Sequence, residues 1–292
     1  MKTKLAALFF MISLTFYAQE KYEYMGAVKL NGDIKTVISY RLVFSESNGI
    51  VKGYSVTDLS GPHETKNAIS GTYNSKTKEF SFKEEDIIYT KSTISDDMFC
   101  FVNFTGKVKL VNENSIMEGN FKGLFKNHQK CIDGTLTLVG SARIYKLVNK
   151  VNKKIQKSKK VNEADKKKFN PVNILDSLKV NSLTRSQNLN VFSKSGNVKL
   201  ELWDNGKEDG DLVTLYLDGA ILIKNYKVTN EKKIFNLTVK NTSTLKITAI
   251  TEGTVSPNTA VMKIDADERV IEVYTNLKKD EDAYITLIKS KQ

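Results

Sequence analysis

The stretch Leu202-Trp203-Asp204-Asn205-Gly206-Lys207-Glu208-Asp209-Gly210-Asp211, continued by Leu212-Val213-Thr214-Leu215-Tyr216-Leu217-Asp218-Gly219, holds the only tryptophan of the chain and its densest group of acidic and glycine residues. Residues 197–203 alternate between two faces, Val198, Leu200 and Leu202 against Lys199, Glu201 and Trp203, and residues 213–217 alternate in the same way. A period of two over such runs is typical of half-buried strands. Asn-Gly and Asp-Gly pairs adopt positive φ readily, so the stretch predicts two strands joined by a tight polar loop.

Hard oxygen ligands gather in this loop, on Asp204, Asn205, Asp209 and Asp211. Calcium takes six to eight oxygens, so these four residues would form only part of a calcium site, and their spacing does not fit an EF-hand. The alternative is a polar hairpin whose Asp and Asn side chains bond their own backbone. We predict the structural turn and keep calcium as a candidate cofactor.

The run Trp203-Asp-x-Gly-x-x-Asp-Gly-Asp-x-Val-x-Leu-Tyr-Leu-x-Gly219, with Ser256-Pro257-Asn258-Thr259-Ala260 downstream, resembles an uncharacterised C-terminal module of secreted Bacteroidetes proteins. The resemblance covers about the last third of the chain. It implies a fold and a compartment, and it carries over no catalytic residue.

Residues 189–292 show a succession of short alternating segments separated by polar turns. About nine strands in about 100 residues predict a β-sandwich of immunoglobulin-like size. A Cys–Trp–Cys pattern is missing from this part of the sequence, which argues against an antibody-type domain.

Residues 20–145 also alternate in short segments, and the whole chain is therefore predicted to be all-β. The first module is expected to be a curved antiparallel sheet, either a barrel or a sandwich. Gly53, Gly71, Gly119 and Gly134 each follow an apolar residue by two positions, as expected where strands bend. Aromatic residues are concentrated here, and they predict either a packed core or, in a barrel, an apolar ligand cavity.

Residues 1–19 read as a secretory signal, with Lys2 and Lys4 before an apolar core that is too short to span a bilayer comfortably. A secreted or periplasmic location follows, without a transmembrane segment. In an oxidising compartment the only two cysteines, Cys100 and Cys131, predict a disulfide worth about 3–4 kcal/mol, with two buried thiols as the alternative.

Residues 146–188 differ from both modules because lysines dominate their first half. The segment from Lys146 to Lys168 has ten lysines against Glu163 and Asp165, a net charge of +8 within a chain total of +12. The basicity is therefore local, which argues against a nucleic-acid partner. We predict a solvated, partly helical linker whose apolar residues are irregularly spaced. The alternative is attachment to an anionic lipid or polysaccharide surface of the envelope.

Familiar catalytic patterns are missing from the sequence. His63 and His128 are not in zinc spacing, and neither a nucleophile elbow nor a phosphate-binding glycine loop occurs. The acids Glu84-Glu85-Asp86 are expected to be solvated. We predict a non-catalytic binding or envelope protein whose ligand is a protein, a glycan or a small apolar molecule. The alternatives are an envelope-polymer hydrolase that uses these carboxylates and a calcium-stiffened adhesin-like protein.

Overall fold

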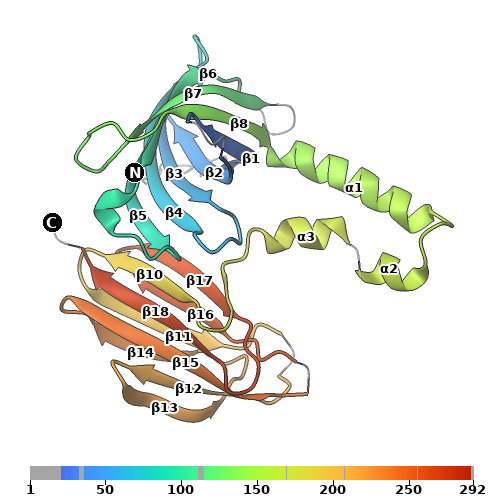
Figure 1. Cartoon of the computed structure of the whole chain (residues 1–292), viewed down its shortest axis with the longest axis vertical. Helices are drawn as coiled ribbons and strands as arrows, with labels where there is room; N and C mark the ends of the chain where they lie inside the picture. Colours follow the sequence, from blue (N-terminus) through green and yellow to red (C-terminus); the bar gives the residue numbers. More distant parts are fainter. Residues whose placement is uncertain are drawn as a thin grey trace, which may run out of the picture.

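The computed structural model describes residues 21–32, 36–110, 115–168, 170–206, 208–254 and 256–290. A barrel, three helices that project from it and a second β module follow one another along the chain (Figure 1). The prediction of a mostly β protein is confirmed. The predicted secretory signal at residues 1–19 lies outside the described residues. No helix among the described residues has the length and apolar character needed to cross a membrane.

Eight antiparallel strands close into the barrel. Each strand pairs with the next, and the last pairs back with the first. The strands are β1 (Lys21–Leu30), β2 (Val37–Ser47), β3 (Ile50–Thr57), β4 (Thr65–Asn74), β5 (Glu79–Thr90), β6 (Phe101–Lys107), β7 (Ile116–Leu124) and β8 (Gly134–Gly140). Of the two architectures left open by the sequence, the barrel is therefore the one observed.

Aromatic rings occupy the barrel interior. The Phe44 ring lies 5.3 Å from that of Tyr22 and 5.0 Å from that of Phe80, measured between centroids. Phe82 continues the stack to Phe104 at 5.7 Å. Core packing, which removes a large apolar area from water, accounts for these buried rings, and the apolar ligand cavity stays a prediction.

Two of the predicted bending glycines lie where a neighbouring strand passes too close for a side chain. A Cβ at Gly53 would lie 2.1 Å from the carbonyl oxygen of Val43, and one at Gly71 would lie 2.0 Å from that of Ser81. Such approaches let strands coil tightly enough to close a small barrel.

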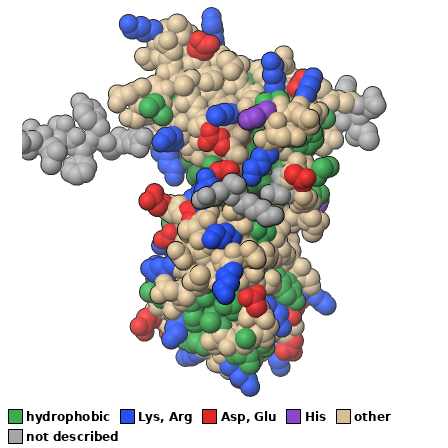
Figure 2. All heavy atoms as spheres, turned by 90° about the vertical axis from the view of Figure 1, so that its left-hand side faces the viewer, with side chains coloured by type: hydrophobic (Ala, Val, Ile, Leu, Met, Phe, Trp, Pro, Cys, Tyr) green, Lys and Arg blue, Asp and Glu red, His purple; other side chains and the backbone are tan. Residues whose placement is uncertain are grey.

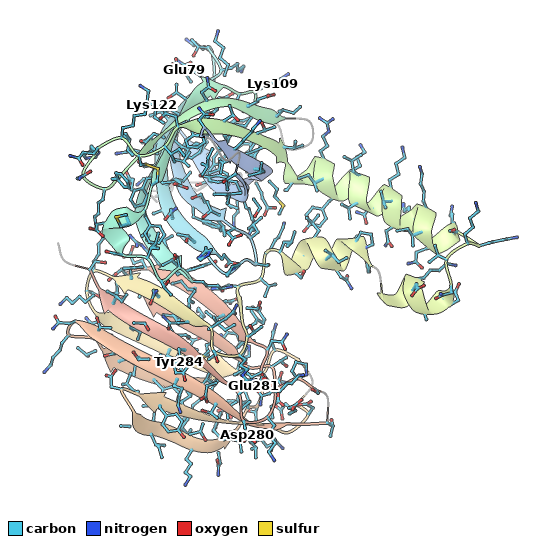
Figure 3. All side chains as sticks on the ribbon, in the orientation of Figure 1. Glu79, Lys109, Lys122, Asp280, Glu281 and Tyr284 are labelled. Carbon is cyan, nitrogen blue, oxygen red and sulfur yellow. A yellow bond between two sulfur atoms is a disulfide. The ribbon has the colours of Figure 1, made fainter. Side chains whose placement is uncertain are left out.

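The disulfide between Cys100 and Cys131 is present, as predicted. It joins the residue before β6 to the connection between β7 and β8, where Figure 3 draws the yellow bond. A short 3-10 helix, η1 (Asp96–Met98), precedes it.

Three helices occupy most of the lysine-rich segment: α1 (Ser141–Lys157), α2 (Glu163–Lys168) and α3 (Pro171–Ser177). The interpretation of its apolar residues as irregularly spaced is wrong. Ile144, Leu147, Val148, Val151 and Ile155 recur at helical spacing on one side of α1, which begins before the predicted segment.

Two sheets share one hydrophobic core in the second module. One contains β10 (Asn188–Ser193), β12 (Asp211–Leu217), β13 (Ala220–Lys227), β15 (Thr242–Glu252) and β18 (Asp282–Lys289); the other contains β9 (Ser182–Leu183), β11 (Asn197–Trp203), β14 (Lys233–Thr238), β16 (Val261–Ala266) and β17 (Arg269–Thr275). β10 pairs with β18, and β9 with β17, in parallel.

The hairpin expected across the acidic loop is wrong. β11 pairs with β14 and β16, whereas β12 pairs with β13 and β15, so the loop crosses from one sheet to the other. Both strands alternate because each lines the shared core from its own sheet, and alternation alone does not say which sheet a strand joins.

We expect Gly71→Ala to lower the free energy of unfolding by about 1–3 kcal/mol, because its methyl group would overlap the Ser81 carbonyl. Gly206→Ala is a matched control, since its nearest neighbour, Asp204 Oδ1, lies 3.4 Å from the added Cβ. Chemical denaturation of both variants checks this. Equal stability of the two variants would contradict the close approach of β4 and β5.

Candidate functional site at the junction of the two modules

Strand β5 carries the barrel sheet into the second module. The sequence suggests two short strands here, but they form one strand of 12 residues with irregular register against β4. Its last residues pair antiparallel with β10, Tyr89 opposite Val191 and Thr90 opposite Asn190. One sheet of 13 strands therefore runs through both modules.

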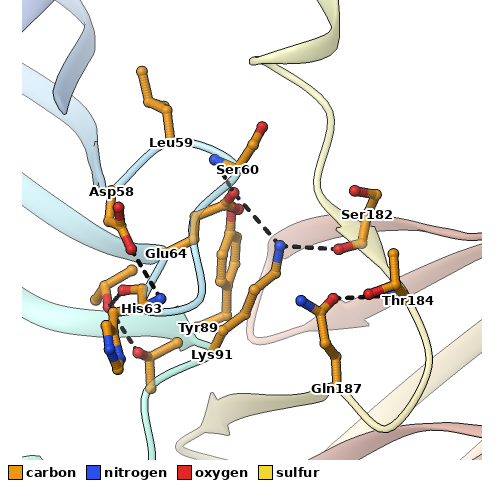
Figure 4. Close-up of polar contacts among 12 residues, drawn as sticks. Asp58, Leu59, Ser60, His63, Glu64, Tyr89, Lys91, Ser182, Thr184 and Gln187 are labelled. Atoms are coloured by element: carbon orange, nitrogen blue, oxygen red, sulfur yellow. Dashed lines mark hydrogen bonds and ion pairs between the residues drawn. The ribbon is translucent and has the colours of Figure 1, made fainter.

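A buried ion pair lies beside this crossing (Figure 4). Lys91 Nζ is 3.5 Å from Glu64 Oε2, and both side chains are only 3% exposed. Lys91 Nζ also donates to the Ser182 carbonyl of the second module at 2.9 Å. Glu64 accepts from the Tyr89 hydroxyl at 2.8 Å and from the Ser60 N–H at 2.8 Å. Burial and the Glu64 carboxylate raise the pKa of Tyr89 well above its usual range.

A cleft of about 290 Å³ opens next to this pair, between the outer face of the barrel and β17. Both modules and the chain that connects α3 to β9 contribute to it. Its lining is Arg41, Tyr54, Val56, Lys66, Tyr89, Lys179, Val180, Asn181, Val270, Ile271, Glu272 and Tyr274. A second hollow of about 340 Å³ continues from it, since Arg41 and Lys179 line both.

Lys66 is the half-buried cation of this cleft. Its Nζ lies 4.0 Å from the centroid of the Tyr54 ring and 5.9 Å from that of Tyr89. Among the described residues, no carboxylate lies within ion-pair distance of it. Burial, and then the positive charges of Arg41 and Lys21, lower the pKa of Lys66 to about 8.

Asn181 supplies an unsatisfied amide to the same cleft. The residue is 7% exposed, and neither its Oδ1 nor its Nδ2 has a hydrogen-bond partner. Buried side-chain amides are normally paired, because an unmade hydrogen bond costs about 1–3 kcal/mol. These two atoms have almost no exposed surface, so a ligand would reach them only after the Asn181 side chain turned into the cleft.

The other cations of the cleft are partly neutralised. Arg41 Nε lies 2.7 Å from Glu23 Oε1, and Lys179 Nζ lies 2.8 Å from Glu23 Oε2. Burial tends to raise the pKa of Glu23, but Lys179 and Arg41 hold it below its ordinary value. Of the three cations that line the cleft, Lys66 is thus the one without an acidic partner among the described residues, and the cleft is suited to a small anion.

The prediction that Glu84, Glu85 and Asp86 are solvated is wrong for Glu84. This residue is 5% exposed and points into the barrel, where Oε1 accepts from Tyr40 OH at 2.7 Å and Oε2 from the Val102 N–H at 2.7 Å. Burial raises its pKa. The pairing of β5 with β4 shifts register between Glu84 and Asp86, and this irregularity separates Glu84 from Glu85 and Asp86.

Glu85 and Asp86 form ion pairs with different partners. Glu85 Oε1 lies 3.0 Å from the Lys83 ammonium on the barrel surface. Asp86 Oδ2 lies 3.1 Å from Lys194 Nζ and 3.6 Å from Arg269 Nη2, both in the second module. Because the three carboxylates of this run have different partners, they do not form a paired acid and base.

The acidic loop places two of its four predicted ligands in the interior. Asp204 and Asp211 are buried, whereas Asn205 is exposed. Asp204 Oδ1 accepts from the Gly206 N–H at 2.7 Å, as expected of a turn that bonds its own backbone. Among the described residues, no three acidic, His or Cys side chains are arranged to hold a metal ion. Calcium binding therefore stays a prediction.

Asp211 joins the two halves of the sequence motif. Its Oδ2 accepts from the Thr259 N–H at 2.8 Å, and Asn258 Nδ2 donates to the Thr251 carbonyl on β15 at 2.7 Å. Asp211 Oδ1 is buried without a partner. Burial, together with the carboxylates of Asp209, Asp204 and Glu252, raises its pKa to about 6.

Sequence reasoning missed the junction cleft. Its residues come from β2, β3, β4, β5, β17 and the segment before β9, and the lysines and tyrosines among them are unremarkable where they stand in the chain. Only the pairing of β5 with β10 brings them together.

Lys91→Met should lower the free energy of unfolding by about 3 kcal/mol, because it leaves the Glu64 carboxylate buried without its cation. The control Lys83→Met removes a solvent-exposed partner of Glu85 and should cost less than about 1 kcal/mol. Denaturant titrations measure both. Adding Glu64→Gln to Lys91→Met should restore much of the loss; a strictly additive double variant would contradict the pairing.

Asp211→Asn should raise the melting temperature at about pH 7.5 in EDTA by about 2–4 °C. A pKa of about 6 lies above the ordinary value, so the stability that protonated Asp211 provides at low pH is lost as pH rises towards and through 6. The variant removes this loss and keeps an acceptor for Thr259, so the difference should vanish near pH 4.

Repeating these melting experiments with added calcium tests whether the acidic loop binds that ion. If millimolar calcium raises the melting temperature of the unmodified protein but not that of Asp211→Asn, the loop binds calcium. If calcium has no effect on either, the calcium prediction is wrong and only the titration of Asp211 remains.

Comparisons with known proteins found no matching family model, no matching curated protein and no matching solved structure. The resemblance of the last third to a module of secreted Bacteroidetes proteins therefore stays a prediction, and function has to be inferred from the junction itself.

Proposed function

We propose that this is a non-catalytic binding protein of a secreted or periplasmic compartment, and that it holds a small organic anion in the junction cleft. The observation that carries the proposal is Lys66, a half-buried cation without a carboxylate partner among the described residues, in a cleft that Asn181 also lines. A perturbed lysine in a cleft between modules is a common feature of ligand sites.

The chemistry of the cleft favours an anion with a flat or apolar portion. Lys66, Arg41 and Lys179 would face its negative group, and Asn181 would exchange hydrogen bonds with a neighbouring polar atom. Tyr54, Tyr89 and Tyr274 offer ring surfaces for the remainder. A carboxylate-bearing sugar or a small aromatic acid combines these properties.

The second module is proposed to be a β-sandwich that supplies one wall of the site. Its two sheets share a core, and β17 and the segment before β9 reach the cleft. The disulfide supports an oxidising compartment, because such bonds persist mainly outside the cytosol.

Binding is favoured over polymer hydrolysis by the positions of the acids. A glycosidase of the usual kind needs two carboxyl groups that flank one bond. Glu84 is inside the barrel, and Asp86 is engaged by two cations of the second module. The hydrolase alternative would need other residues.

Thermal shift against a panel of small anions, including glucuronate, benzoate, citrate and phosphate, tests the proposal. At least one organic anion should raise the melting temperature at about pH 7, and the effect should decline above pH 8 because Lys66 loses its proton there. Lys66→Met should abolish the shift, whereas Lys52→Met on the exposed surface should not. A shift that survives Lys66→Met would disprove this site.

Lys66→Met should also stabilise the ligand-free protein at about pH 7, by about 2–4 °C in melting temperature. A lowered pKa means that folding opposes the charged form, so stability rises as pH increases from about 8 towards the ordinary value near 10.5. The advantage of the variant should therefore disappear near pH 10. A destabilised variant at pH 7 would assign Lys66 a structural role.

A further inference from the structure

We propose that helix α1 is a docking element for an anionic lipid surface, independent of the ligand cleft. Helix α1 extends away from both β modules, and its contacts with the barrel are to β1 and β8, beside its first residue (Figure 1). It spans 17 residues, a length of about 25 Å. None of its side chains is buried, and Figure 3 shows them standing out along the helix.

One side of α1 combines apolar and basic residues in the pattern of an interfacial helix. Leu147 is 56% exposed and Val151 is 49% exposed, and they are neighbours one turn apart. Arg143, Lys150 and Lys154 lie three or four residues from them, on the same flank. Long lysine stems allow the charged ends to reach headgroups while the apolar residues enter the boundary below.

The charge of α1 has no internal compensation. The helix has six basic residues and no acidic one, and none of the six forms an ion pair within the described part of the chain. The β modules differ from it: Lys199, Lys232 and Lys263 all surround Glu201. On the face drawn in Figure 2, basic and acidic side chains are interspersed over both modules.

Helices α1, α2 and α3 together form a helical arm, residues 141–177. The contacts of α1 with the other parts of this arm, and with Lys179 just after it, hold α1 in place without covering Leu147 and Val151. The Tyr145 hydroxyl bonds to Asp176 of α3, and Lys179 Nζ lies 4.7 Å over the Tyr145 ring. Gln156 Nε2 donates to the Lys166 carbonyl at the far end. Leu147 and Val151 remain exposed after these contacts are made.

A lipid surface fits this flank better than a purely ionic polymer does. Anionic polysaccharide or nucleic acid would need only the positive charges, because its binding comes from charge neutralisation. Exposed leucine and valine between the cations add an apolar contribution that a bilayer interface can use and a purely ionic polymer cannot. The occupant we infer is therefore a membrane leaflet rich in anionic phospholipid.

Sedimentation with vesicles tests this directly. The protein should bind vesicles of phosphatidylglycerol and phosphatidylethanolamine at low salt, bind phosphatidylcholine vesicles at least about tenfold more weakly, and lose binding near 0.5 M salt. Lys150→Glu with Lys154→Glu should weaken binding at least about tenfold. The control pair Lys224→Glu with Lys240→Glu makes the same charge change on exposed lysines of the second module and should have little effect.

A second pair of changes separates docking of the helix from simple charge attraction. Leu147→Ser with Val151→Ser keeps every charge and should weaken vesicle binding about tenfold. Undiminished binding by this variant, equal losses in the control pair, or retention on heparin without vesicle binding would each overturn the proposal. Melting curves confirm that the variants fold, and none of these outcomes depends on whether an anion binds the cleft.

Discussion

The continuation of β5 from the barrel into the second module is the constraint on which the rest of the structure depends. Tyr89 and Thr90 end a barrel strand and at the same time pair with β10. Polar groups that are buried beside this crossing need hydrogen-bond or ion-pair partners. Lys91 has both, since it forms an ion pair with Glu64 and donates a hydrogen bond to the Ser182 carbonyl. Removing water from such a pair is expensive, so it is stable only because several hydrogen bonds complete it.

The cleft is a consequence of this joint. Once β5 and β10 are paired, the outer face of β2 to β4 lies opposite β17, and the charges of both surfaces share a confined space. Lys66 is then half-buried, no carboxylate among the described residues lies within ion-pair distance of it, and its pKa falls because burial penalises the ammonium. Under the proposed function, the free energy lost by burying this ammonium would be offset when an anion binds.

The helical arm is stabilised in a different way from the two β modules. Its residues gain little from burial, since no side chain of α1 is buried and Leu147 and Val151 are about half exposed. A helix of this length is marginal alone, so contacts at Tyr145 and Gln156 are needed to hold it. The second module neutralises part of its charge internally, for instance around Glu201, whereas the cations of α1 form no ion pair among the described residues.

The sequence by itself determined the β class, the disulfide of Cys100 and Cys131, the bending glycines and the local basicity, because each depends on alternation, residue type or neighbours along the chain. The helical spacing of Ile144 to Ile155 is likewise contained in the sequence. Only the tertiary structure decided the closure of the barrel, the burial of Glu84 and the convergence of Lys66 with Asn181. Strand alternation shows which face of a strand is apolar, but it does not show which strand lies beside it.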